Sequence, residues 1–349
     1  MASTIRLRCG RTIGPEHSVL IVAELGQNHN GSVDQARALI DAAAWAGADA
    51  VKFTKRDLDC ELSGEARDRP YLVRHAFGAT YGEHRRALEL SVEDYAGLAR
   101  HARDFGLLLV ATSCDIPSAV AMNTLPLDAL KIASRDLNNL PLVEHLAGLG
   151  KPLLVSTGMS GLGEVDRCVD VLQRARAEYA LLQCTSVYPT PYNQVHLRSM
   201  NRLAERYECP VGFSDHTLGT HVSVAAVARG ASVIEKHLTL DCGAKGSDHA
   251  CSLEPEAMRQ LVEQIRDVES ALGSCDKPVP ADVVPVRAKL GRSLVTRVPL
   301  AAGTRIEEPM LVLKSPGHGI GWLDRQQVVG RIVKRDVCAD EVLTIDDVM

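Results

Sequence analysis

Residues 234–255, IEKHLTLDCGAKGSDHACSLEP, bring many ionisable side chains together in one short segment. Two histidines, two lysines and several acids follow directly after Val233 and Ile234, an apolar pair typical of the end of a buried strand. Gly243 and Gly246 give the backbone of this segment conformational freedom. Because loops at the ends of buried strands commonly carry catalytic groups, this segment is a candidate part of an active site.

Functional side chains stand near the end of each of eight apolar, β-rich runs of the chain. They are Glu24, Lys52, Thr112, Lys131 with Ser134, Ser156, Gln183 with Thr185, Ser214 with His216, and Glu235 with His237. A single lysine or serine at a strand end is usually only solvated. Eight such groups would converge on one pocket if the runs form one barrel, and buried lysines and acids are rare unless they are paired or used.

The composition of this set indicates two kinds of chemistry. Lys52 and Lys131 supply positive charge, and hydroxyl donors accompany them: Thr112, Ser134, Ser156, Ser186 and Ser214. Such a cluster suits a ligand that carries a phosphate and a carboxylate. His216 and His237 end the last two runs, and with Glu24 they suit a divalent metal. From spacing alone, two histidines that only line the mouth of a barrel are an equally good interpretation.

The elements that would position these groups are short strands that alternate with amphipathic helical segments. The runs are residues 19–26, 50–54, 107–113, 129–134, 152–158, 179–186, 210–216 and 232–240. Continuous apolar strands followed by helices predict a parallel sheet that is buried on both faces. Eight such units favour an α/β fold of the (β/α)8 type, a TIM barrel, and an open doubly wound sheet is the alternative.

The chain has 349 residues, a mass of 37.7 kDa and a net charge of −5. This charge argues against broad binding to nucleic acid or to anionic membranes. There is no long apolar run that would cross a membrane, and the first residues lack the apolar centre of a signal peptide. Ten cysteines without a CxxC pair fit thiols in a reducing cytoplasm, so we expect a cytoplasmic protein.

The character of the sequence changes near residue 275. We therefore expect a barrel domain over residues 1–274, a proline-bearing linker over 275–286 and a small β-rich domain over 287–349. The segments VPLAAGTRIEEPM (298–310) and VCADEVLTIDDVM (337–349) share residue types in step, which suggests two equivalent halves of one small fold. Chance similarity between two short β-turn-β pieces explains so few matches equally well.

Nine motifs together carry a resemblance to a known family. They are AELGQNHNG, ADAVKF, TYGEHRRALELS, LKIAS, STGM, LLQCTSVYPTPY, GFSDHTLG, IEKHLTL and KGSDHACSLEP. With them the chain, over nearly its whole length, resembles the sialic acid synthases, or nonulosonate synthases. TYGEH, LQCTS and KGSDH are most similar to the animal-type branch, which makes a 9-phosphate. The resemblance implies a TIM barrel followed by an antifreeze-like (SAF) domain, and a homodimer in which that domain is swapped between subunits.

The resemblance also implies a transferase that condenses phosphoenolpyruvate with an aminosugar aldehyde. The acceptor would be N-acetylmannosamine or its 6-phosphate, and the products a sialic acid-type nonulosonate, or its 9-phosphate, and phosphate. A related synthase that uses phosphoenolpyruvate with another aldose acceptor, in a specialised sugar pathway, is the alternative.

Matched to the family's motifs, individual positions of this sequence acquire expected roles. His216 and His237 would be catalytic and bind a divalent metal, Mn²⁺ or Mg²⁺. Glu24 and Asp136 would be catalytic, and Tyr188 and Asp248 would face the sugar. The residues expected to bind phosphoenolpyruvate are Lys52, Thr112, Lys131, Ser134, Ser156, Ser186 and Ser214.

Three positions depart from the family pattern, and four other functions stay open. Thr54 stands where glutamine is common, Arg135 where many members have glycine, and Ser315 where many bacterial members have an arginine. The rivals are a synthase of the 3-deoxy-octulosonate type, a Schiff-base aldolase using Lys131 or Lys52, a metal-dependent amidohydrolase and a non-catalytic sugar-binding protein. The antifreeze-like tail argues against the first, and the absence of an HxH pair argues against the amidohydrolase.

Overall fold

The computed structural model describes residues 4–349, and its larger part is a closed barrel of eight parallel strands. Each strand pairs with the next along the chain, and the last, β10, pairs with the first, β3. The strands are β3 (Leu20–Gly26), β4 (Ala50–Lys55), β5 (Leu108–Ser113), β6 (Ala129–Ile132), β7 (Leu153–Ser156), β8 (Tyr179–Cys184), β9 (Val211–Asp215) and β10 (Val233–His237). The predicted (β/α)8 barrel is confirmed, and the open-sheet alternative is wrong.

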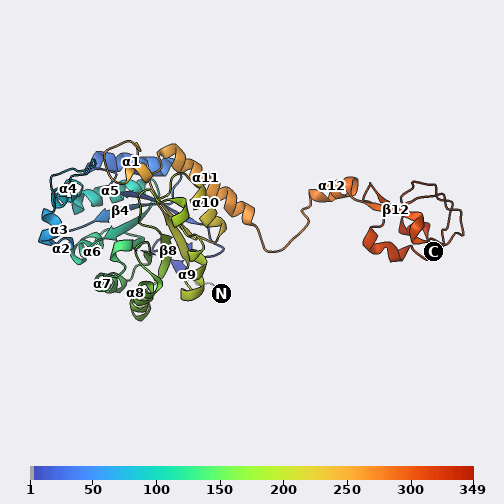
Figure 1. The fold of residues 1–349 in the computed structure, drawn as a ribbon, viewed down its shortest axis with the longest axis horizontal. Helices are drawn as coiled ribbons and strands as arrows, with labels where there is room; N and C mark the ends of the chain where they lie inside the picture. The colour runs from blue at the N-terminus through green and yellow to red at the C-terminus, as the bar shows by residue number, and fades with distance from the viewer. Residues whose placement is uncertain (1–3) are drawn as a thin grey trace. The chain divides into compact units, whose positions relative to one another are not determined.

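Helices lie around the outside of this barrel (Figure 1). They are α1 (Val33–Trp45), α5 (Val92–Asp104), α6 (Ile116–Met122), α7 (Leu140–Gly148), α8 (Leu162–Arg174), α9 (Ser199–Tyr207), α10 (His221–Ala228) and α11 (Pro255–Leu272). Polar side chains fix where several begin: Ser32, before α1, accepts a hydrogen bond from the Gln35 N–H, and Asp115 caps α6 in the same way. Each helix returns the chain to the starting end of the barrel, so the next strand runs parallel to the last.

The longest connection between a strand and its outer helix follows β4. It contains three short helices: α2 (Leu58–Glu61), α3 (Gly64–Asp68) and α4 (Tyr81–Ala87). Thr80 and Glu83 form a capping box that fixes the start of α4. This connection starts at the carboxyl end of the barrel, where enzymes of this architecture place their active sites.

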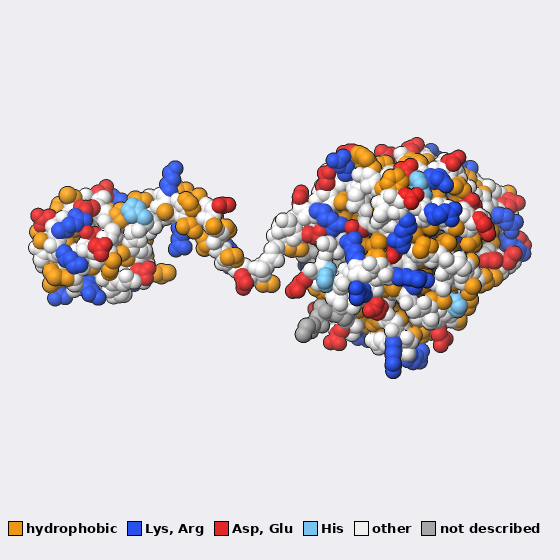
Figure 2. Space-filling view, turned by 180° about the vertical axis from the view of Figure 1, so that it is seen from behind, with side chains coloured by type: hydrophobic (Ala, Val, Ile, Leu, Met, Phe, Trp, Pro, Cys, Tyr) orange, Lys and Arg blue, Asp and Glu red, His pale blue; other side chains and the backbone are white. Residues whose placement is uncertain are grey.

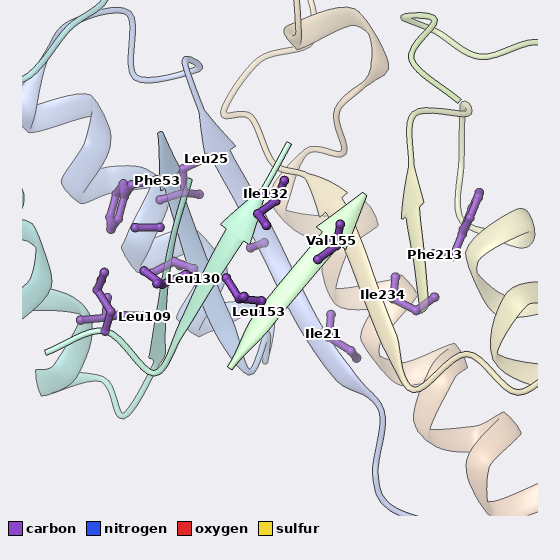
Figure 3. Packing of buried hydrophobic residues seen from close by; sticks show 14 of the residues in the cluster. Ile21, Leu25, Phe53, Leu109, Leu130, Ile132, Leu153, Val155, Phe213 and Ile234 are labelled. Carbon is purple, nitrogen blue, oxygen red and sulfur yellow. The ribbon is translucent and has the colours of Figure 1, made fainter. Parts of the chain in front are cut away.

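Apolar side chains fill two layers of the barrel domain. Figure 3 shows part of the larger layer, in which residues such as Leu109, Leu130 and Val155 point outward from the strands toward the helices. The smaller layer fills the barrel itself, where Ile5 and Ile13 of the hairpin β1 (Ile5–Arg6) and β2 (Thr12–Ile13) join the interior side chains. Both faces of every strand are thus covered, which explains their continuous apolar character.

Within the barrel, side chains alternate between the two faces of each strand. The side chains that face inward change from apolar to polar toward the carboxyl end of the strand. In β3, Leu20 and Val22 belong to the apolar interior layer, and Glu24, two positions further, lines a cavity at the carboxyl end. In β6, Ala129 and Lys131 follow the same rule. The two-residue period of a strand therefore carries polar groups to one end of a packed barrel.

Residues Ser274–Met349 form a second compact unit. It contains α12 (Val283–Leu290) and the antiparallel pair β11 (Ser293–Thr296) and β12 (Leu311–Lys314). Its core is small and apolar and includes Leu294, Ile306, Val328 and Leu343. The last four positions of the predicted linker, 283–286, are helical and not extended.

The two similar segments of this unit are structurally equivalent, but in a different register from the one expected. Leu300 and Val337 pair with each other, and the backbone N–H of each donates to the carbonyl of the other. Ile306 and Leu343 are both buried in the core. Leu300 is thus the equivalent of Val337, and Ile306 is the equivalent of Leu343. The alignment of segment 298–310 with segment 337–349, which places Val298 against Val337, is wrong.

Charges of both signs are interspersed on the face of the barrel domain that Figure 2 presents. Within residues 4–349, no helix is long and apolar enough to cross a membrane. All ten cysteines lie in this range and are free thiols.

Candidate active site

A cavity opens at the carboxyl end of the barrel and encloses about 640 Å³, part of it open to solvent. Its lining contains twelve of the thirteen predicted site residues: Glu24, Lys52, Thr112, Lys131, Ser134, Ser156, Ser186, Tyr188, Ser214, His216, His237 and Asp248. They come from all eight strands or from the loops that follow them.

Glu235 lies between the two lysines at the floor of the cavity. Its Oε1 is 3.0 Å from Lys52 Nζ and 3.7 Å from Lys131 Nζ, and it accepts a hydrogen bond from Ser214 Oγ at 3.0 Å. Lys52 Nζ is also 2.8 Å from Glu24 Oε2. The two lysines are therefore held in place by carboxylates before any ligand binds.

Burial shifts the pKa of these groups in opposite directions. It lowers the pKa of Lys52 to about 8, although Glu235 beside it favours the charged form. Burial alone would raise the pKa of Glu235, but the charges of Lys131 and Lys52 outweigh it and hold that pKa at about 2. Glu235 is thus ionised at neutral pH, and Lys52 is mostly charged but close to losing its proton.

Hydroxyl groups surround the lysines, and two of them are free to bind a ligand. Lys131 Nζ donates to Ser156 Oγ at 2.6 Å. Thr112 Oγ1 and Ser186 Oγ are buried and have no hydrogen-bond partner within the described chain. Because an unpaired buried hydroxyl is costly, these two oxygens are expected to meet a polar ligand.

Gly158 keeps three of the site's side chains close together. A Cβ at this position would lie 2.7 Å from Ser186 Oγ, 2.8 Å from Cys184 Sγ and 2.9 Å from Ser134 Oγ. The Gly158 N–H also donates to Ser134 Oγ at 3.0 Å. A larger residue would push these groups apart, which gives the glycine of the STGM motif a physical reason.

His216 and His237 lie side by side at the other side of the cavity, with ring centroids 5.3 Å apart. His216 Nδ1 lies 3.1 Å from the Thr185 carbonyl oxygen, to which it donates, and this leaves Nε2 as an acceptor. Burial lowers the pKa of His237 to about 3, so this imidazole is neutral at physiological pH. Its Nδ1 is buried without a hydrogen-bond partner among residues 4–349.

The unpaired Nδ1 of His237 and the Nε2 of His216 could both face a divalent metal, and a carbonyl bound to the other ring nitrogen, as in His216, is typical of such ligands. Against the effect of burial, the nearby Cys184 thiol raises the pKa of His216, so a metal here would have to displace the proton of that ring. The expected third ligand is not supported, because Glu24 pairs with Lys52. In the described part of the chain, no group of three or more histidine, cysteine, aspartate or glutamate side chains is placed to hold a metal. A metal here would take its remaining ligands from water or substrate.

Tyr188 and Asp248 reach the same side of the cavity from different loops. The Tyr188 ring lies 4.1 Å from the His216 ring and 6.1 Å from the His237 ring. Asp248 belongs to the loop after β10 that is rich in ionisable residues, and it accepts a hydrogen bond from Ser247 Oγ at 2.6 Å. This loop does bring a carboxylate over the two histidines, as the sequence suggests.

Asp136 is the predicted site residue that the structure does not bring into the cavity. Ser134–Asp136 form a 3₁₀ turn, in which successive side chains point in different directions. Ser134 therefore lines the cavity, while Asp136 Oδ2 lies 3.4 Å from Arg135 Nε in a separate charged cluster. Its expected catalytic role is not supported.

Several lining residues were not among the predicted site residues. They are Gly26, Gln27, Thr54, Arg56, Ala133, Arg135, Met159, Cys184 and Glu235. Thr54, Cys184 and Glu235 follow from the two-residue period of their strands, which places them inward with Lys52, Leu182 and Val233. Arg56 lies beyond the end of β4, where no periodicity locates a side chain.

Comparison with known proteins places this site in a family. The profile described as "NeuB family" matches residues 39–277, and the SAF domain profile matches residues 291–349. The chain belongs to the NeuB family. It is therefore an enzyme of the nonulosonate synthase class, a transferase, with a C-terminal SAF domain.

Similar proteins are named for different activities. The chain is 38% identical to the human N-acetylneuraminate-9-phosphate synthase, over 90% of this chain and 88% of that protein. It is 37% identical to the N,N'-diacetyllegionaminic acid synthase of Legionella pneumophila, over 98% of each chain. The crystal structure of the sialic acid synthetase of Leptospira borgpetersenii superposes with a TM-score of 0.72 and 30% identity, covering 82% of this chain and 95% of the other. At these similar identities, the relatives are named for different nonulosonate products.

Proposed function

We propose that this NeuB-family enzyme condenses phosphoenolpyruvate with an N-acylated aminohexose, in its aldehyde form, to give a nonulosonate and phosphate. The observation that carries the proposal is the meeting of two lysines, free hydroxyls and two adjacent histidines in one cavity. The lysine side suits the doubly anionic substrate, and the histidine side suits the aldehyde. The names of the relatives agree with this assignment.

The residues around Lys52 and Lys131 would hold phosphoenolpyruvate. The two ammonium groups neutralise its phosphate and carboxylate, and the hydroxyls of Thr112 and Ser186 gain the partners that they lack. Glu235 orients both lysines toward the ligand. Binding of the anion also stabilises the proton on Lys52, whose pKa burial lowers.

His216 and His237 would hold a divalent metal, Mn²⁺ or Mg²⁺, as ligands on neighbouring strands. When bound, such an ion supplies Lewis-acid polarisation of the aldehyde oxygen. His237 is neutral at physiological pH, and the carbonyl of Thr185 orients the ring of His216 so that its Nε2 is directed away from that contact. Tyr188 and Asp248 lie beside these rings and would position the hydroxyls of the sugar.

The carbon–carbon bond forms between C3 of phosphoenolpyruvate and the aldehyde carbon, which gains a hydroxyl. Positive charge then builds at C2, where water adds, and Glu24 is placed in the cavity to stabilise this charge or accept the proton of the water. Collapse of the tetrahedral centre breaks the bond from C2 to the bridging oxygen and releases phosphate.

The direct experiment measures phosphate release from phosphoenolpyruvate with a panel of N-acylated hexosamines, each with and without a 6-phosphate. Turnover with N-acetylmannosamine or its 6-phosphate is expected. Turnover restricted to an aldose without an acylamino group would favour the second candidate, a related synthase with another acceptor. The departures at Thr54 and Arg135, both in the cavity lining, are the observation that favours keeping this candidate.

We also propose that the enzyme works in the cytoplasm as a homodimer in which the SAF domain of one subunit caps the barrel of the other. The cavity is partly open to solvent, and a reaction through a cationic centre needs controlled access of water. The free thiols agree with a reducing compartment.

A further inference from the structure

Two arginines line the same cavity and play no part in the chemistry described above. Arg56 and Arg135 belong to the lining, and they follow β4 and β6 instead of lying within them. Lys52 and Lys131 lie inside those two strands. The arginines are therefore nearer the mouth than the lysines, on the same side of the barrel.

The two arginines are neighbours, because Glu61 contacts both. Its Oε1 lies 3.4 Å from Arg135 Nη2, and its Oε2 lies 3.8 Å from Arg56 Nε. Arg135 Nη2 also donates to Cys114 Sγ at 2.7 Å. Cys114 follows β5, so the cluster extends over the ends of three adjacent strands, β4, β5 and β6.

Arg56 is buried with donors to spare. It is 2% exposed, its Nε lies 3.0 Å from Glu89 Oε1, and its Nη1 has no hydrogen-bond partner in the described chain. A buried guanidinium that lines a cavity and keeps an unpaired N–H group is expected to meet an acceptor there. The fork of a guanidinium matches a phosphate or carboxylate.

The acids of this cluster are distinct from those around the lysines. Lys55, Arg56 and Arg135 stand against Glu61, Glu89 and Asp136, whereas Lys52 and Lys131 pair with Glu24 and Glu235. Burial raises the pKa of Glu89 and of Asp136, so these carboxylates hold their charge less firmly than the arginines do.

The barrel order places this cluster opposite the histidines. In the closed ring of eight strands, β6 stands four strands from β10, which carries His237, and β5 stands four strands from β9, which precedes His216. A chain-like aldose with its aldehyde at the histidines would extend across the mouth toward the arginines. Its far end, and not phosphoenolpyruvate in the deeper lysine site, would reach them.

From these contacts we infer that Arg56 and Arg135 form a subsite for an oxyanion on the far end of the acceptor aldose, so that this enzyme selects an anionic acceptor. The inference rests on the proposed function, since it assumes that the aldose enters this cavity. The shared chemistry is that of a phosphate monoester or a carboxylate at the terminal carbon.

The test compares three acceptors with the same aldehyde: N-acetylmannosamine, its 6-phosphate and the 6-carboxylate, N-acetylmannosaminuronate. With the intact chain, kcat/KM is expected to be at least about tenfold higher for one of the anionic acceptors than for the neutral one. Arg56→Gln and Arg135→Gly should each remove most of this preference while leaving KM for phosphoenolpyruvate within about twofold. Phosphate and carboxylate are distinguished by which acceptor shows the preference.

Arg67→Gln is the matched control, because Arg67 lies in the same connection after β4, pairs with Asp59 and does not line the cavity. It should leave the preference unchanged. Arg56→Lys keeps the positive charge but lacks the guanidinium fork. Loss of the preference in this variant therefore reports on the fork and not on a general defect in folding. Equal kcat/KM for all three acceptors, or a rise in KM for phosphoenolpyruvate alone in the two variants, would overturn the inference.

A binding measurement keeps this test separate from the proposed function. The alditol made by reducing N-acetylmannosamine 6-phosphate cannot react, and calorimetry in the presence of phosphoenolpyruvate measures its binding directly. Binding that weakens about tenfold or more in Arg56→Gln and not in Arg67→Gln supports the subsite even if no turnover occurs. Binding that is equal in both variants contradicts it.

Discussion

Lys236 and Asp215 form an ion pair behind the two site histidines. Lys236 Nζ lies 2.9 Å from Asp215 Oδ2, and both side chains are fully buried. Asp215 also accepts hydrogen bonds from Ser223 Oγ and from the Thr217 N–H. Asp215 is the last residue of β9, directly before His216, and Lys236 directly precedes His237 on β10, so the pair fixes the relative position of the two histidines from outside the barrel.

Breaking this pair should destabilise the protein and disturb the histidines. Lys236→Met is expected to cost about 3–5 kcal/mol in the free energy of unfolding, because it leaves the Asp215 carboxylate buried without its partner. The double variant Lys236→Met/Asp215→Asn should recover part of this loss. Urea unfolding curves measure both effects. A single variant as stable as the intact protein would show that the pair does not hold the strands.

Activity should depend on a divalent metal held by His216 and His237. His216→Ala or His237→Ala is expected to abolish turnover without unfolding the protein, because both side chains line the cavity and lie outside the apolar layers. Circular dichroism and a turnover assay check the two parts separately. Full activity of the metal-stripped protein in excess chelator would contradict this prediction.

Lys131 should act through its charge and not as a Schiff-base nucleophile. Its Nζ already donates to Ser156 Oγ and lies near Glu235, an arrangement suited to an ammonium ion. Lys131→Ala should weaken phosphoenolpyruvate binding by roughly 1.5–3 kcal/mol, about ten- to a hundredfold, and Lys131→Arg should retain part of the affinity. Borohydride trapping is the check, and a covalent adduct at Lys131 would contradict the assignment.

Lys52 should set the basic limb of the pH profile. Burial lowers its pKa to about 8, so the free enzyme loses this positive charge as the pH rises through that value. The kcat/KM for phosphoenolpyruvate, which reports on the free enzyme, should therefore fall above about pH 8. Lys52→Arg should move the fall to higher pH, since a guanidinium keeps its proton. A wild-type profile that stays flat well above pH 8 would refute this.

The same shift has a consequence for stability, with a definite sign. The folded pKa of Lys52 lies below its ordinary value of 10.5, so charging this residue costs stability at low pH. The cost is fully present below about pH 8 and fades as the pH rises toward 10.5. The free energy of unfolding of Lys52→Met, relative to that of the intact protein, should therefore be higher at pH 7 than at pH 9.5. The reason is that only the intact protein gains stability as Lys52 loses its proton between these two values.

The SAF domain should act on the barrel of a second subunit. A chain that ends at Gly273 retains the entire barrel unit and should fold but lose turnover. Mixing it with a full-length His237→Ala subunit should restore some activity, because the intact barrel of one chain then meets the tail of the other. A truncated protein as fast as the full chain would contradict the proposed cap.

Much of the barrel and its site could be predicted because one rule serves both. A buried parallel strand must be apolar on both faces, so it is visible in the sequence, and its last inward residue must face the cavity. Glu24 and Lys131 follow this rule. The choice of Gln183 as a strand-end residue disregards the two-residue period. Gln183 faces outward and donates to the Val195 carbonyl, while the next residue, Cys184, lines the cavity.

The arginine cluster could not be predicted, because it depends on loops. Arg56, Glu61 and Arg135 come from segments without a repeating pattern, and only the folded barrel brings them together. The same reason explains why Asp136 lies outside the cavity lining, since one 3₁₀ turn directs its side chain away while the nearby Ser134 lines the cavity. In the SAF domain, the residue types shared by the two similar segments gave the wrong alignment between them. The correct alignment follows from burial, because Ile306 and Leu343 are the two equivalent core residues.

The most direct test of the central claim is turnover in ¹⁸O-labelled water with phosphoenolpyruvate, Mn²⁺ and N-acetylmannosamine or its 6-phosphate. Phosphate and the nonulosonate are measured together by mass spectrometry. We predict that they form in equal amounts, only when the aldose is present, and that the phosphate carries no label, because water adds to C2 and the bridging oxygen leaves with phosphorus. Labelled phosphate, or release that does not depend on the aldose, would contradict the account.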